Sequence, residues 1–143
     1  MHRLNKNRLP LCLLARFERR FILIKLTWKR VGISLAALAT AGLHIYSAFA
    51  LYPPPQFSPD PVFTLNGLGY LGLLGAYILP IPFFQKRHIL VWWVLGGYAI
   101  LTIILWAIIG DHTFSTLTGQ VGISAKIAEL LLLAFLWADR PRN

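Results

Sequence analysis

Four long apolar stretches are the feature that most constrains how this chain folds. They cover residues 31–51, 62–84, 89–109 and 117–138 of the 143-residue sequence. About 20 apolar residues suffice to cross the hydrocarbon core of a bilayer as a helix. Because backbone groups cannot stay unpaired in lipid, each stretch is predicted to form a transmembrane helix rather than an open strand.

The composition and the short connections between the stretches define the fold class. Hydrophobic residues make up 57% of the sequence and charged residues 13%, whereas a soluble domain has about 45–50% and about 25%. This excludes a soluble enzyme with a solvated surface, and it also excludes a disordered chain. Short connections make consecutive helices antiparallel neighbours. We therefore expect an all-α membrane protein in which residues 31–143 form an antiparallel four-helix transmembrane bundle.

The basic residues are distributed unevenly along the chain. Nine of the 14 Lys and Arg residues lie within residues 1–30. The others outside the apolar stretches are Lys86, Arg87, Arg140 and Arg142. Because residues 52–61 and 110–116 contain neither Lys nor Arg, the positive-inside rule predicts that both termini are cytoplasmic. The same distribution accounts for the net charge of +9, so nucleic acid is not expected as a partner.

Residues 1–30 are predicted to form a basic arm that precedes the bundle, because charges recur too often for a span. Within residues 9–30, large apolar side chains repeat at steps of three and four: Leu14, Phe17, Phe21, Ile24 and Trp28. This spacing predicts an amphipathic interfacial helix on the cytoplasmic lipid surface, where its cations contact anionic headgroups. The alternative is a docking arm for a partner subunit.

Small residues on the predicted helices indicate close helix packing. Residues 67–72 read GLGYLG, which matches a nucleotide-binding pattern, but the segment lies inside an apolar stretch and not between a strand and a helix. Small side chains instead let helix backbones approach one another in lipid. The residues predicted to do so are Gly69, Gly72 and Ala76 in the second stretch, and Gly119 and Gly122 in the fourth.

Polar side chains from all four stretches are predicted to meet in the outer half of the bundle. This polar layer consists of His44, Asn66, Tyr70, Tyr98, Thr102, Ser124, Lys126 and Glu129. Lys126 and Glu129 are three positions apart, a spacing at which opposite charges on a helix neutralise one another. Three interpretations stay open for the pair: a structural ion pair, a site that handles a proton or substrate, and a contact with another subunit.

No cofactor or metal is implied by the sequence. A haem bound by two histidines needs a second histidine at the depth of His44. None of the others is expected there, because His2 lies near the N-terminus, His88 at the inner membrane boundary and His112 in an outer loop. The four histidines are dispersed, and no acidic cluster accompanies them, so no metal-binding spacing is present. No nucleophile motif occurs either, so catalysis by the chain alone is unsupported. A quinone or lipid headgroup could use His44, Asn66 and Tyr98.

Two apolar segments read LNGLGYLGLLG at residues 65–75 and AKIAELLLLAFL at residues 125–136. Through these segments the chain resembles an uncharacterised group of small prokaryotic four-span integral membrane proteins. Members of that group often carry a cation followed three positions later by Glu or Gln, a pattern that Lys126 and Glu129 match. The resemblance implies the fold and a prokaryotic plasma membrane location. It implies no activity.

Three functions are compatible with these features. The first is a non-catalytic integral membrane subunit or accessory protein of a larger complex, with other membrane subunits or a second copy as partners. The second is a small proton-coupled transporter or carrier that uses the Lys126–Glu129 pair. The third is a membrane protein that binds a quinone or a redox cofactor.

Overall fold

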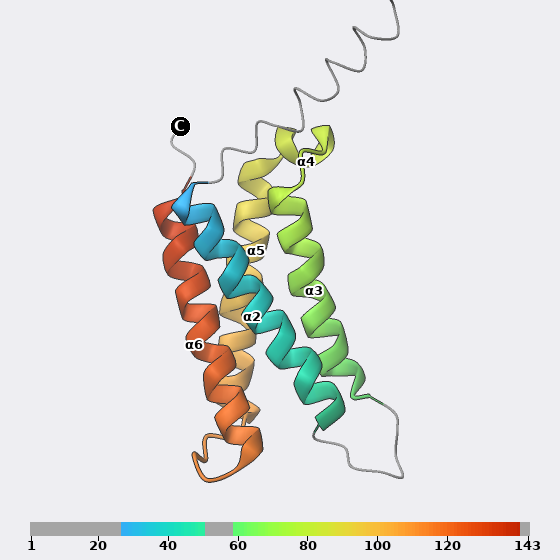
Figure 1. The fold of residues 1–143 in the computed structure, drawn as a ribbon, viewed down its shortest axis with the longest axis vertical. Helices are drawn as coiled ribbons and strands as arrows, with labels where there is room; N and C mark the ends of the chain where they lie inside the picture. The colour runs from blue at the N-terminus through green and yellow to red at the C-terminus, as the bar shows by residue number, and fades with distance from the viewer. Residues whose placement is uncertain (1–26, 51–58, 141–143) are drawn as a thin grey trace, which may run out of the picture.

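The chain folds into four long helices that run alternately up and down, as the computed structural model shows for residues 27–50 and 59–140 (Figure 1). The long helices are α2 (Trp28–Ala50), α3 (Pro61–Ile78), α5 (His88–Ile109) and α6 (Leu117–Ala138), and a short helix α4 (Pro82–Lys86) joins α3 to α5. All four long helices are long and apolar enough to cross a membrane. The predicted all-α four-helix bundle is confirmed. The interfacial helix was predicted mainly for residues that lie outside the described ones.

The bounds of the long helices agree closely with the predicted spans, with one correction. The predicted fourth span matches α6, and α2 begins at Trp28, three residues before the first predicted span. The second predicted span, 62–84, is too long, because α3 ends at Ile78 and Leu79 is extended. Pro80 has no backbone N–H and disfavours a helical conformation in the residue before it, so the helix stops there. The chain then turns through α4.

We call the end of the bundle where α2 begins and α6 ends the proximal end, and the opposite end the distal end. Helix α2 packs closely along both α3 and α6, and α5 completes the bundle against the same two helices. The side chains that are fully buried between these helices include Ile33, Tyr70, Leu95 and Leu132. The opposite faces of the helices are apolar and exposed, which suits contact with lipid tails.

Polar groups cap the two helices that start at the distal end. The Asp60 carboxylate accepts hydrogen bonds from the backbone N–H groups of Val62 and Phe63 at 2.8 and 3.0 Å. The Thr116 hydroxyl accepts a hydrogen bond from the N–H of Gly119 at 3.1 Å. These caps satisfy backbone donors that have no partner within a helix. They fix where α3 and α6 begin, and with that the depth of the polar side chains further along.

The small residues contribute unequally to packing. A Cβ at Gly67 would lie 2.6 Å from Cγ1 of Ile45 on α2, and one at Gly69 would collide with the Tyr98 hydroxyl on α5. Ala76 packs against the core. The predicted role of Gly72 is wrong, because Gly72 is exposed and a Cβ there would meet nothing within 4 Å. Helix α3 thus packs closely against α2 at Gly67 and against α5 at Gly69, and Gly72 faces outward.

Candidate functional site

A buried ionic network joins α2 to α6 in the distal half of the bundle. Nζ of Lys126 lies 2.6 Å from Oε2 of Glu129, so the ion pair predicted from their spacing is present. Oε1 of the same carboxylate lies 3.1 Å from Nε2 of His44, which the sequence placed in the same layer without pairing it to Glu129. Glu129 is 0% exposed. The carboxylate therefore holds Lys126 on its own helix through one oxygen and His44 on α2 through the other.

The network is close to electrically neutral, and that explains how it can be buried. Lys126 and Glu129 cancel one another's charge, and Nζ of Lys126 also donates to the Thr102 carbonyl of α5 at 3.3 Å. An isolated charge in an apolar interior costs several kcal/mol, whereas a paired and hydrogen-bonded one costs far less.

The hydrogen bonds around His44 define which ring nitrogen carries the proton in the neutral ring. An ionised carboxylate only accepts, so Nε2 of His44 donates to Glu129. The amide Nδ2 of Asn66 lies 3.3 Å from Nδ1 and 3.2 Å from Nε2, and because Nε2 already donates to Glu129, Nδ1 is the acceptor for this amide. Asn66 belongs to α3, so its amide connects the third helix to the network. The ring of His44 also stacks on Tyr70 and on Phe63, with centroids 6.0 and 6.1 Å away.

A second group of polar contacts ties α3 to α5 beside this network. The Tyr70 and Thr102 hydroxyls are 2.7 Å apart and form a hydrogen bond, and the Thr102 hydroxyl also lies 2.9 Å from the Ala99 carbonyl oxygen. The Tyr98 hydroxyl donates to the backbone carbonyl of Asn66 at 3.3 Å. Seven of the predicted layer residues thus come together from four helices. Ser124 does not join them, because its side chain is exposed and its hydroxyl donates to the Gln120 carbonyl one turn back on α6.

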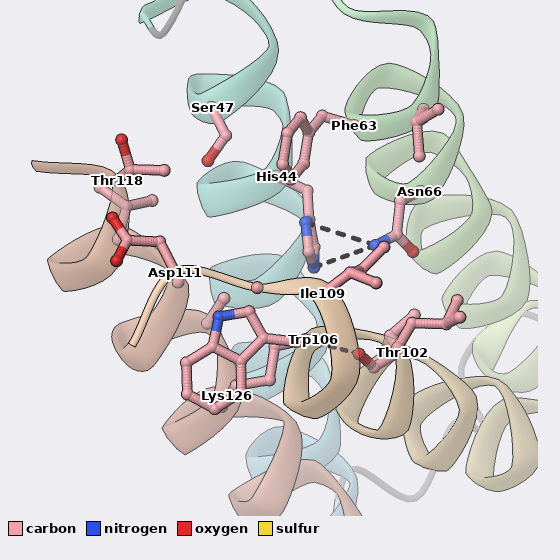
Figure 2. A pocket seen from close by; sticks show the side chains of 16 residues that line it. His44, Ser47, Phe63, Asn66, Thr102, Trp106, Ile109, Asp111, Thr118 and Lys126 are labelled. Atoms are coloured by element: carbon pink, nitrogen blue, oxygen red, sulfur yellow. Dashed lines mark hydrogen bonds between the residues drawn. The ribbon is translucent and has the colours of Figure 1, made fainter. Parts of the chain in front are cut away.

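A cavity of about 370 Å³ lies between the distal ends of the helices and reaches down to this network (Figure 2). His44, Asn66, Thr102 and Lys126 contribute polar atoms to it, and Phe63 and Trp106 contribute aromatic rings. Figure 2 shows Trp106 on the α5 side of the cavity, across from His44 and Asn66. Pockets of about 300–1,000 Å³ with apolar walls and few polar groups are typical of small-ligand sites.

The rim of the cavity carries a carboxylate. Asp111, in the connection between α5 and α6, lines the cavity. Its oxygens accept hydrogen bonds from the Thr116 hydroxyl at 2.6 Å and from the Thr113 backbone N–H at 2.9 Å. These bonds favour the ionised form and hold the pKa of Asp111 below its ordinary value. Asp111 is therefore negatively charged at neutral pH.

Glycines at the distal end of α6 let the neighbouring chain approach closely. A Cβ at Gly119 would collide with the backbone carbonyl of Thr113, and one at Gly122 would lie 2.7 Å from Nε1 of Trp106. Both residues were predicted to pack closely. Their partners are the α5–α6 connection and the indole of the cavity wall. Gly122 thus gives Trp106 the room to lie against α6.

Sequence reasoning missed a polar cluster at the proximal end. The Tyr77 hydroxyl donates to Oδ2 of Asp139 at 2.7 Å, and Nε of Arg30 lies 3.8 Å from the same oxygen. Nζ of Lys29 donates to the Ala138 carbonyl at 2.6 Å, which satisfies a backbone acceptor at the end of α6. No spacing within one helix could have revealed these bonds, because they join residues from three helices. They fasten the proximal end of the bundle.

Metal binding finds no support within residues 27–50 and 59–140, where no three His, Cys, Asp or Glu side chains come together. His88 lies at the proximal end against Tyr77, with ring centroids 4.8 Å apart. His112 packs on Trp106 in the distal connection, at 4.5 Å. Neither is a hydrogen-bonding partner of His44.

Comparison with protein families, with curated proteins and with solved structures gave no match. The resemblance of residues 65–75 and 125–136 to the four-span group stays a prediction. The fold itself defines the class: this is an integral membrane protein of the all-α type. Its function has to be inferred from the geometry of the network and the cavity above it.

Proposed function

We propose that this chain is a non-catalytic integral membrane protein that binds a small ligand in its distal cavity. The observation that carries the proposal is the cavity of about 370 Å³ that is lined at its floor by His44 and Lys126, the two residues that hold the buried Glu129 carboxylate. A bundle held together by packing alone does not need polar groups at the base of an open cavity, because each of them costs free energy to bury. Such groups repay that cost when they position a ligand.

The two halves of the bundle differ in a way that supports a binding role. Towards the proximal end, Leu74, Leu95, Leu132 and Leu136 fill the space between the helices. Towards the distal end, the side chains do not fill the space between the helices, and the cavity lies there. A ligand would therefore enter from the distal end and stop at the buried network.

We infer that the distal end faces away from the cytoplasm. The described cations that lie outside the network are all at the proximal end: Lys29, Arg30, Lys86, Arg87 and Arg140. The guanidinium groups of Arg87 and Arg140 lie over the rings of Phe83 and Trp137, at 4.9 and 5.3 Å. Aromatic and basic residues together are typical of the lipid headgroup region on the cytoplasmic side, where they can contact anionic lipids. In a Cys12→Ser background, a cysteine at Ser115 should react with an impermeant maleimide in intact cells, and one at Lys86 should not.

The binding role is compatible with an accessory subunit, since a subunit can supply a ligand site to a larger assembly. Native mass spectrometry after mild detergent extraction tests that part separately. A heteromeric complex supports the accessory role, and a monomer or homo-oligomer refutes it.

A proton-coupled carrier is the second candidate. The observation that favours it is a bridging carboxylate, Glu129, directly beneath the cavity and held by two groups that bind protons. Transport requires the apolar proximal half to open as well. In proteoliposomes, a carrier would move protons together with its ligand, whereas a binding protein would move none.

The direct test of the binding proposal compares wild-type protein with a variant whose cavity is filled. Val121 lines the cavity and takes no part in the polar network, so Val121→Phe reduces the cavity volume and leaves the ionic contacts in place. The matched control is Leu130→Phe on the same helix, where the side chain is exposed. Small molecules that copurify with each protein are identified by mass spectrometry. A compound retained by wild type and Leu130→Phe but lost from Val121→Phe supports the proposal. Equal retention by all three proteins contradicts it.

A further inference from the structure

The charges around the cavity restrict what it can bind. The cation at its floor, Lys126, is already neutralised by Glu129 at 2.6 Å. The carboxylate at its rim, Asp111, forms its bonds to Thr113 and Thr116, and no described cation lies within ion-pair distance of it. An anionic ligand would meet repulsion at the rim and no free positive charge at the floor. Asp111 would attract a cationic ligand at the rim, but the floor offers such a ligand no free carboxylate, because Glu129 is fully buried and already bonded to His44 and Lys126. The site therefore favours an uncharged ligand.

Asn66 has an unpartnered acceptor, Oδ1, but that atom is buried and does not open onto the cavity, so the free hydrogen-bonding capacity of the floor is that of a donor. A lysine ammonium has three N–H groups and no acceptor. Two of those of Lys126 go to Glu129 and to the Thr102 carbonyl, which leaves one for a ligand. The indole N–H of Trp106, also on the cavity wall, has no hydrogen bond to any described residue. Since both groups only donate, the matching ligand atom is an acceptor without a proton of its own, such as a carbonyl oxygen.

The walls of the cavity suit a flat, apolar body. Val62, Leu105, Ile109 and Val121 contribute aliphatic surface from three helices. Phe63 and Trp106 contribute aromatic faces, and Phe63 already lies nearly parallel to the His44 ring, with an angle of 23° between the planes. A volume of about 370 Å³ holds a single ring with its substituents or the head of a neutral lipid. It is too small to enclose a long acyl or isoprenoid chain, which would have to extend out between the helices.

We propose that the distal cavity binds the uncharged, carbonyl-bearing head of a lipophilic molecule, with Nζ of Lys126 donating a hydrogen bond to the carbonyl oxygen. This inference rests on the proposed function and specifies its ligand. Two sources carry that chemistry, a quinone and a neutral glyceride. Trp106 acts as a second donor to the same head or to a second carbonyl on it. The Glu129 carboxylate orients the Lys126 ammonium and removes its net charge, which makes it a positioning residue.

The experiment measures binding of four defined probes to the full chain in detergent by isothermal calorimetry. Decylubiquinone and 1,2-dioctanoylglycerol carry carbonyls on an uncharged head, decylbenzene lacks any acceptor, and decanoate is anionic. We expect saturable binding of decylubiquinone or dioctanoylglycerol, at least about tenfold tighter than that of decylbenzene and decanoate. Tighter binding of decylubiquinone identifies the quinone source, and tighter binding of dioctanoylglycerol identifies the glyceride source.

Two variants separate this inference from the proposed function. Val121→Phe should weaken binding of the preferred probe more than tenfold, and Leu130→Phe should leave it unchanged. The double variant Lys126→Met/Glu129→Leu removes the donor without leaving a lone charge, so it should lose the preference for carbonyl probes but retain weak binding of decylbenzene. Decanoate or decylbenzene binding as tightly as the carbonyl probes overturns the carbonyl assignment while leaving the cavity a binding site. If Val121→Phe also fails to change the binding of any probe, the cavity itself is refuted as the site.

Discussion

His44 on α2 and Glu129 on α6 lie 85 positions apart in the sequence and are joined by a hydrogen bond of 3.1 Å from Nε2 to Oε1. Both side chains are buried, and the other oxygen of the carboxylate holds Lys126. A single carboxylate thus accepts from an imidazole and an ammonium through its two oxygens. This arrangement links α2 to α6, balances the charge of Lys126 and holds in place His44 and Lys126, which line the distal cavity.

Removal of one member of the ion pair should be more costly than removal of both. Glu129→Leu leaves the Lys126 ammonium buried with only a carbonyl partner, and breaking a buried pair in this way typically costs about 3–5 kcal/mol. Lys126→Met should cost less than Glu129→Leu, because His44 still donates a hydrogen bond to the carboxylate. The double variant should recover most of the loss. The free energy of unfolding in mixed micelles of dodecyl maltoside and SDS provides the measurement. A double variant as unstable as the sum of the singles would show that the two charges do not stabilise one another.

Gly67 and Gly72 on α3 should respond oppositely to the same substitution. Gly67→Leu forces a side chain against Ile45 and against the backbone oxygen of Ala41, and overpacking of this kind costs about 1–3 kcal/mol. Gly72→Leu places its side chain in open space, and leucine has the higher helix propensity by about 1 kcal/mol. Thermal unfolding in detergent should therefore show a lower midpoint for the first variant and an unchanged or higher one for the second. A loss of stability at Gly72 would mean that this face contacts another chain.

The proximal cluster is predicted to contribute to stability through the Tyr77 hydroxyl. Tyr77→Phe removes its hydrogen bond to Asp139 and leaves the ring packing intact. A hydrogen bond to a charged group contributes about 1.5–3 kcal/mol, so a loss in that range is expected in the SDS unfolding assay. Tyr46→Phe is the matched control on α2, because Tyr46 is 49% exposed and its hydroxyl has no described partner. Equal effects of the two substitutions would contradict the assigned role of the Tyr77–Asp139 bond.

Asp111 is predicted to make stability depend on pH in the acid range. Its pKa in the folded protein is lowered, chiefly by the Thr116 hydroxyl, so its contribution is present above the ordinary value of 3.8. That contribution is lost as the pH falls through the lowered value. Wild type should therefore exceed Asp111→Asn in thermal midpoint at neutral pH, and the difference should shrink on acidification below about pH 4. A difference that grows on acidification would contradict the sign of the shift.

The fold could be predicted from sequence because backbone N–H and C=O groups cannot stay unpaired in lipid. A chain of this composition pairs them by forming helices. Stretches of about 20 apolar residues must become helices, and the short connections then set their directions. The end of α3, in contrast, could not be predicted from hydropathy. Hydropathy continues through Pro80 and Pro82, so the apolar pattern gives no sign that the helix ends at Ile78. The backbone requirement of proline decides the boundary there.

The candidate site could be predicted in part, because polar residues in an apolar span are rare and tend to face inward. The spacing of Lys126 and Glu129 is local to one helix, so their contact could be derived. The bond between His44 and Glu129 depends on the rotation of two helices about their axes, which the sequence pattern does not specify. Ser124 illustrates the same point, because its own backbone satisfies its hydroxyl one turn back and it can face outward. The cavity depends on the side chains that surround Trp106, and no motif encodes it.

A double-mutant cycle on His44 and Glu129 measures directly whether the bridged network exists. The free energies of unfolding of wild type, His44→Leu, Glu129→Leu and the double variant are determined in the same mixed micelles. If the two side chains share a buried hydrogen bond to a charged group, the loss in the double variant should fall short of the sum of the single losses by about 1.5–3 kcal/mol. Losses that add to within about 0.5 kcal/mol would show that His44 and Glu129 act independently, and the bridged network at the base of the cavity would be refuted.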